Sequence, residues 1–152
     1  MTPELNRLKE SDKKTLLEAP AVVSVLSALS ADGTIDPNEK AEAIRLAHLR
    51  TFTSPEILNN YYKEVELNFE SNMNNIINNL PLDYEAKKEY LRNELKKLAP
   101  ILVNLDREFS MTLIDSLKSF AKHVFKAHSH FLEYFILPVF MNEIEKEIFG
   151  EK

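Results

Sequence analysis

The chain has no cysteine and only two glycines among its 152 residues. The lack of cysteine excludes disulfides, thiolate metal sites and thiol nucleophiles. Gly150 lies in the terminal segment, so Gly33 is the one glycine in the body of the chain. A glycine-rich phosphate loop and a G-x-S-x-G nucleophile turn need several glycines close together, and neither occurs. The sequence therefore excludes phosphate-loop and serine-nucleophile enzymes.

Long apolar runs and basic stripes are also missing. The longest apolar segment, FLEYFILPVFM at residues 131–141, is too short to span a bilayer, and Glu133 and Pro138 interrupt it. The start of the chain carries no apolar export segment, so we expect a cytoplasmic protein without direct membrane insertion. The net charge is −5, and lysine and arginine come as scattered pairs, which argues against nucleic-acid binding.

Helical periodicity runs through almost the whole chain. Apolar residues recur at intervals of three and four, and no stretch alternates long enough to indicate a sheet. The length and the apolar fraction of 44% suit one domain over residues 1–152. The sequence thus predicts an all-α, compact bundle of six to seven helices.

Apolar stripes and helix-end signals locate the individual helices. Pro20 starts or kinks the first long helix, Ser54 caps a helix with Pro55 at its first position, and Asp83 caps the next. The stripe that follows Ser54 belongs to one long helix or two abutting ones, and Pro138 kinks the last helix, from about residue 131. The stripes are Val22, Val25, Leu26 and Leu29; Ala41, Ile44 and His48; Leu58, Tyr61, Tyr62, Val65, Phe69, Met73, Ile76, Ile77 and Leu80; Leu91, Leu95, Leu98, Leu102 and Leu105; and Leu113, Leu117, Phe120 and Val124.

The four histidines do not form a catalytic pattern. A carboxylate di-iron bundle needs a glutamate three residues before a histidine, and no histidine here has one; H-E-x-x-H is absent as well. His48 shares its predicted face with Ala41 and Ile44, so we expect a hydrogen-bonded core residue. His123 shares a polar face with Ser116 and Ser119, so we expect His123 to be solvated. We predict that the chain is not an enzyme.

The stretch SADGTIDPNE, which begins at Ser30, contains half of a calcium-binding loop. Its glycine, its apolar residue and its last glutamate match the second half of the twelve-residue EF-hand loop. The first half is missing, because Ala28 has no side-chain oxygen and the backbone there continues the preceding helix. What remains is a cluster of carboxylates that hard cations such as Ca²⁺ prefer, with a glycine that shapes the turn. The metal-ligand candidates are Asp32, Asp36 and Glu39, and the turn-shaping residue is Gly33.

Helix capping explains most of the same stretch. Asp36 is a preferred N-cap, Pro37 suits the first helical position, and Glu39 can close a capping box. Gly33 fits the left-handed residue just past a helix. Only Asp32 has no capping role, and it lies at a helix C-terminus, where a negative charge is unfavourable by roughly 0.3–1 kcal/mol. Both interpretations of the stretch stay open.

The run VLSALSADGTIDPNEKAEAIRLA at residues 25–47 resembles the signature of the TerB-like family, the tellurite-resistance-associated helical proteins. The resemblance implies a compact all-α domain of two related halves that binds a divalent cation through acidic residues. It implies a cytoplasmic, non-catalytic module of the stress response with partners at the membrane. By this resemblance, Asp32, Asp36 and Glu39 would be the metal ligands, and Gly33 would shape the turn.

A second copy of the pattern can be aligned in the other half. If Asp106 is set under Asp32, Ser110 takes the place of the N-cap Asp36. The acidic pattern is damaged there, because Arg107 stands for the glycine and Leu113 for the glutamate. Asp106 is therefore the further candidate metal ligand of this half, with neighbouring Glu108 or Asp115 as alternatives, and Arg107 is a candidate for an ion pair with the first cluster.

The function that competes with weak Ca²⁺ binding is a helical protein-interaction or scaffold module without a metal. The terminal MNEIEKEIFGEK segment leaves three interpretations open: an exposed amphipathic helix for a protein partner, packing against the domain, or a homo-oligomer seam.

Overall fold

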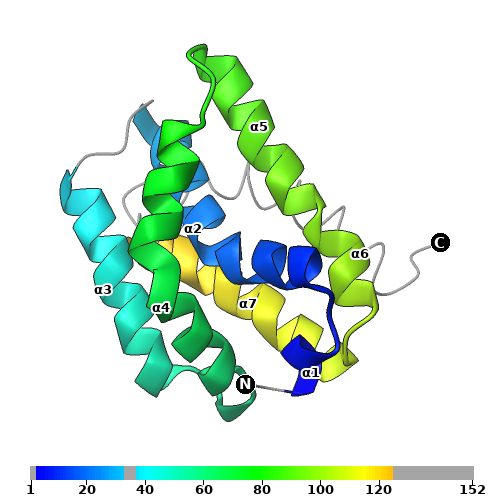
Figure 1. Cartoon of the computed structure of the whole chain (residues 1–152). Helices are drawn as coiled ribbons and strands as arrows, with labels where there is room; N and C mark the ends of the chain where they lie inside the picture. The colour runs from blue at the N-terminus through cyan, green and yellow to red at the C-terminus, as the bar shows by residue number, and fades with distance from the viewer. Residues whose placement is uncertain (1–2, 33–36, 125–152) are drawn as a thin grey trace.

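The computed structural model describes residues 3–32 and 37–124, and this part of the chain contains helices and no strand (Figure 1). Five long helices form a compact bundle, with one short helix before them and another between α5 and α7, so the prediction of an all-α bundle is confirmed. The helix expected from about residue 131 lies outside the described residues. The long helices are α2 (Glu10–Asp32), α3 (Pro37–Thr53), α4 (Glu56–Asn78), α5 (Tyr84–Lys96) and α7 (Arg107–Val124), and the short ones are α1 (Pro3–Asn6) and α6 (Leu98–Val103).

Helix α2 is the centre of the bundle and contacts every helix from α3 to α7. All residues from Ala19 to Leu26 are buried, which is expected of a helix whose apolar residues surround it. Pro20 lies inside α2 and does not start it. The helix continues past the proline, and the buried Ser24 hydroxyl donates to the Pro20 carbonyl at 2.9 Å.

Helix α3 buries a different face from the predicted one. Ala41 and His48 are exposed, so the prediction of a core histidine is wrong. The buried stripe contains Ala43, Leu46, Ala47 and Arg50. An arginine at the fourth position hides this stripe from a search for apolar periodicity. His48 instead pairs with Glu66 of α4 at the surface.

Helix α4 carries the long apolar stripe, which faces the core from Leu58 to Ile76 as predicted. Of the two alternatives, the structure shows two abutting helical segments that meet at a kink at Asn68, where φ is −129° and ψ is 17°. The predicted Ser54 cap is wrong, because the Ser54 hydroxyl donates backward to the Arg50 carbonyl at the end of α3. Only Ser54 and Pro55 separate α3 from α4. The Ser54 hydroxyl therefore bonds to the last turn of α3 and does not cap α4.

Helices α5, α6 and α7 follow with short connections. Asp83 caps α5 as predicted, since its carboxylate accepts the Ala86 N–H at 3.0 Å. The stripe from Leu91 to Leu105 is buried across the break between α5 and α6. The prediction of Ser110 as an N-cap is wrong: α7 already begins at Arg107, and the buried Ser110 hydroxyl donates to the Leu102 carbonyl at 2.8 Å.

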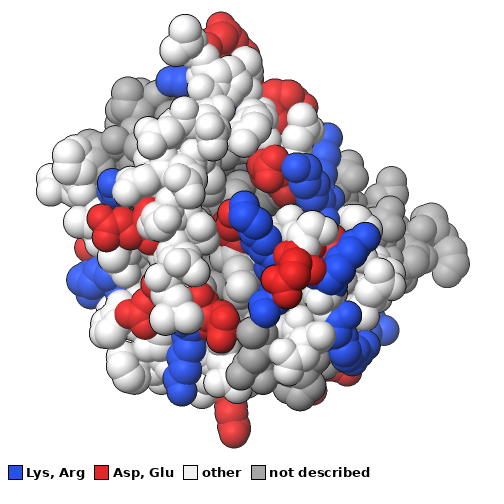
Figure 2. Space-filling view, in the orientation of Figure 1, with Lys and Arg blue, Asp and Glu red and all other residues white. Residues whose placement is uncertain are grey.

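Charged side chains of both signs are interspersed over the face of the bundle drawn in Figure 2. Lysines and arginines on this face lie next to acidic residues and do not form a continuous stripe. Within residues 3–32 and 37–124, no helix combines the length and the apolar character needed to cross a membrane.

Candidate functional site

The acidic stretch lies where one helix ends and the next begins. Helix α2 ends at Asp32 and α3 starts at Pro37. Ala28 has helical backbone, so the first half of an EF-hand loop is replaced by helix, as the sequence predicts. Gly33 and Asp36 fall outside the described residues, as do the side chains of Asp32 and Glu39.

Asp106 has a structural role at the start of α7. Its carboxylate accepts the Phe109 N–H at 3.3 Å, and its carbonyl accepts the Ser110 N–H at 3.0 Å. Figure 1 shows the start of α7 and the end of α2 on opposite sides of the bundle. The structure thus does not bring Asp106 or Arg107 to the acidic turn. Among the side chains that the structure describes, no three His, Asp or Glu residues are grouped to hold a metal ion.

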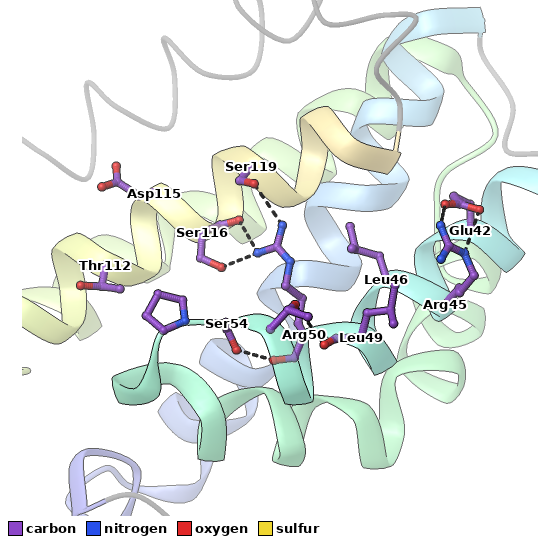
Figure 3. A pocket seen from close by; sticks show the side chains of 12 residues that line it. Glu42, Arg45, Leu46, Leu49, Arg50, Ser54, Thr112, Asp115, Ser116 and Ser119 are labelled. Carbon is purple, nitrogen blue, oxygen red and sulfur yellow. Dashed lines mark hydrogen bonds and ion pairs between the residues drawn. The ribbon is translucent and has the colours of Figure 1, made fainter.

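A pocket of about 610 Å³ with polar and apolar walls opens between α3 and α7 (Figure 3). Three hydroxyl residues of α7 share the face toward α3, since their positions follow at intervals of four and three residues. The start of the α3–α4 connection closes one side, and two leucines of α3 supply an apolar wall. The lining residues are Glu42, Arg45, Leu46, Leu49, Arg50, Thr53, Ser54, Pro55, Thr112, Asp115, Ser116 and Ser119.

Arg50 is the buried charge of this pocket, with only 8% of its surface exposed. One terminal nitrogen, Nη1, donates to Ser116 Oγ at 2.9 Å, and the other, Nη2, donates to Ser119 Oγ at 3.1 Å. The guanidinium is positively charged, so its burial places a full charge in a region of low dielectric. Figure 3 shows the guanidinium pointing from α3 toward the serines of α7.

Tyr62 of α4 contacts both Ser116 and Arg50. Its hydroxyl lies 2.6 Å from Ser116 Oγ, and the Arg50 guanidinium carbon lies 5.9 Å from the centre of its ring. Burial raises the pKa of Tyr62, while the hydrogen bond from Ser116 and the positive charge of Arg50 lower it in part. The phenol, the hydroxyl and the guanidinium thus form one connected polar network through three helices.

The remaining charges lie at the rim. Arg45 pairs with Glu42 on the surface of α3, and that pairing raises the pKa of Arg45 through a hydrogen bond and Coulomb attraction. Asp115 has a side chain 79% exposed and lies 3.8 Å from Lys118 Nζ. In Figure 3 its carboxylate points away from Arg50. The acidic residues of the pocket are therefore solvated or paired at its edge.

Sequence reasoning missed this pocket because its two walls are distant in the chain. Arg50 and Ser116 are 66 residues apart, so no local motif joins them. The sequence places Ser116 and Ser119 on a polar face of their helix together with His123, whose side chain lies outside the described residues, and the structure buries Ser116 against Arg50. The usable signal is an arginine that continues the stripe of Ala43, Leu46 and Ala47 at helical spacing.

A comparison of the chain with models of known families, with curated proteins and with solved structures finds no significant match.

Proposed function

We infer that the chain is a non-catalytic binding module that holds a divalent cation weakly at the turn between α2 and α3. The observation that carries this proposal is the position of the acidic stretch between two helices, with Asp32 as the last residue of α2 and Pro37 as the first of α3. A short turn between two helix ends lets carboxylates from both sides approach one ion. The proposed ligands are Asp32, Asp36 and Glu39, with Gly33 shaping the turn.

Electrostatics supports a cation at this place. The C-terminus of a helix carries a partial negative charge, and Asp32 adds a full one in the last turn of α2. No basic residue occurs in that last turn. A bound Ca²⁺ would offset this repulsion, and carboxylate oxygens are its preferred ligands. With three carboxylates and no first half of an EF-hand loop, we expect a Kd of about 10⁻⁴–10⁻³ M.

The proposal includes the TerB-like family, with its cytoplasmic, stress-related role and a protein partner at the membrane. The family's two related halves would pair the α2–α3 turn with the α6–α7 connection. The helix starts differ between the two: α3 begins five residues after Asp32, whereas α7 begins directly after Asp106. A correspondence of the halves would therefore need a shorter turn in the second one.

Calcium-dependent stability tests the proposed site. At about ten times its Kd, Ca²⁺ should add about 1.4 kcal/mol to the stability of the parent, a rise of roughly 3–5 °C in Tm. The double variant Asp36→Asn/Glu39→Gln keeps both capping groups and should lose that rise, because its amides are poor ligands for Ca²⁺. Thermal unfolding followed by circular dichroism measures both.

A matched control removes the same two charges at another helix start. The variant Asp83→Asn/Glu85→Gln changes the cap and the first turn of α5 and should keep the calcium response. A parent whose Tm is unchanged by millimolar Ca²⁺, Mg²⁺ and Mn²⁺ would contradict the cation site.

Helix capping favours a second candidate function. Helix α3 begins at Pro37, which is where an Asp36 cap with proline at the first helical position would start it. If the acidic residues of the turn serve only to cap and end the two helices, the chain is a helical protein-interaction or scaffold module without metal. An unchanged Tm in the calcium titration, for parent and double variant alike, supports this second function.

A further inference from the structure

We propose that the pocket between α3 and α7 binds a small organic anion with one carboxylate or phosphate group and a short apolar body. This site is separate from the proposed cation turn, since it lies at the C-terminal half of α3 against the middle of α7. Its recognition group is the buried Arg50, and its ligand contacts come from both helices.

The positive charge that would attract this ligand, the Arg50 guanidinium, is held in place by contacts within the protein. Arg50 is held by Ser116 and Ser119 at 2.9 and 3.1 Å, so its planar fork has a defined orientation. Nη1 also lies 3.5 Å from the Ser116 carbonyl, so Arg50 acts on the ligand through its positive charge, whose attraction for an anion increases where water is partly excluded. Because Tyr62 fixes Ser116 at 2.6 Å, the donors are positioned by contacts that do not involve a ligand.

Hydroxyl groups add neutral donors beside the guanidinium. Ser119 Oγ accepts a hydrogen bond from Arg50, and its own proton can be donated to an anion. Thr112 is half-buried on the same face of α7 and lines the pocket. A positive charge with two adjacent hydroxyl donors is a suitable environment for a carboxylate or a phosphate.

An apolar wall completes the site and sets the class of ligand. Leu46, Leu49 and Pro55 line the pocket beside the polar groups. Pockets for small organic molecules combine such surfaces with a few convergent polar groups. The acids of the lining do not oppose an anion at Arg50, because Glu42 pairs with Arg45 and Asp115 points outward at the rim.

Three probes test the charge requirement on the full chain. Hexanoate carries the anion and the apolar body, hexanamide has the same body without charge, and inorganic phosphate has the charge without the body. Two-dimensional amide NMR should show saturable shifts at Arg50 and around Ser119 with hexanoate. Hexanamide should bind at least about tenfold more weakly, because a charge-assisted hydrogen bond is lost.

Four variants test the residues. Arg50→Gln should weaken hexanoate binding about tenfold or more, and Ser119→Ala should weaken it roughly fivefold, the value of one neutral hydrogen bond. Thr112→Val removes the other hydroxyl without a change of charge and should act like Ser119→Ala. Arg107→Gln is the matched control, because it removes the same charge outside the pocket and should leave hexanoate affinity unchanged.

The relative affinities of the three probes and of the variants decide whether the site exists and which anion it takes. Tighter binding of phosphate than of hexanoate supports the site and assigns it to phosphates, and the reverse assigns it to carboxylates. Equal binding of hexanoate and hexanamide, or a folded Arg50→Gln that binds hexanoate like the parent, overturns the proposal. If Arg50→Gln does not fold, Ser119→Ala and Thr112→Val decide, and parental affinity in both overturns it.

Discussion

Pro20 removes a backbone donor from the middle of α2, and a distant tyrosine replaces it. In a helix the amide at position 20 would donate to the Leu16 carbonyl, but proline has no N–H. Leu16 is buried, so its carbonyl cannot turn to water instead. The Tyr61 hydroxyl of α4 donates to this carbonyl at 2.8 Å. A proline inside the central helix is tolerated because another helix satisfies the carbonyl that it leaves open.

Tyr61→Phe should therefore destabilise the fold by about 1–3 kcal/mol, the cost of a buried acceptor left without its donor. The aromatic ring is kept, so the loss reports the hydroxyl and not the packing. Urea unfolding with an unchanged m-value measures the difference in the free energy of unfolding.

A double-mutant cycle with Pro20→Ala tests whether the Tyr61 hydroxyl replaces the backbone donor that the proline lacks. A new amide at position 20 can donate to the Leu16 carbonyl, so in this background Tyr61→Phe should cost clearly less than in the parent. If the two losses add without coupling, the hydroxyl does not compensate for the proline, and this explanation fails.

Helix ends depend on side chains that a local pattern identifies only when no other helix competes for them. Asp83 follows a proline-containing turn and caps α5, whereas Ser54 lies between two helices and bonds to the earlier one. We expect Asp83→Ala to lower the free energy of unfolding by about 1 kcal/mol.

Asp83→Asn provides the control for that prediction, because asparagine caps as well as aspartate and should leave stability nearly unchanged. Chemical denaturation of the two variants beside the parent gives the comparison. An equal loss in both would show that the charge near the α5 N-terminus stabilises the helix, and not the cap itself.

The helices of this chain could be predicted where the buried face is wholly apolar. The stripes of α4 and of α5 with α6 are uninterrupted, and they locate both the helices and their inward faces. The inward face of α3 includes Arg50, so the apolar pattern predicts an orientation two residues away from the observed one. The pocket depends on that orientation and on a contact across 66 residues, which local periodicity does not contain.

At the scale of the whole molecule, the core is organised around two buried tyrosines. Tyr61 and Tyr62 are fully buried, and their rings meet edge to face at 5.1 Å. Burial raises the pKa of Tyr61 well above the ordinary value, with a further contribution from its neighbour, and burial also raises the pKa of Tyr62. The folded state therefore favours the protonated form of both phenols.

Stability should therefore decline in alkaline solution. In the unfolded chain the phenols release their protons near a pH of about 10, while in the folded chain they keep them to higher pH. The folded state then binds more protons than the unfolded state, so the free energy of unfolding is unaffected below that pH and falls above it. Each tyrosine contributes a slope of about 1.4 kcal/mol per pH unit.

The raised pKa values of Lys14 and Lys97 act in the same direction. Their causes are hydrogen bonds and Coulomb attraction to Glu18 and Glu94, and these exposed pairs lose strength as the lysines deprotonate. Urea midpoints measured across the alkaline range, together with tyrosinate absorbance, should show ionisation of the buried phenols only as the chain unfolds. A Tyr61→Phe/Tyr62→Phe variant should start less stable but lose stability with a shallower slope. Tyrosinate absorbance that rises fully before unfolding would contradict the protonated core.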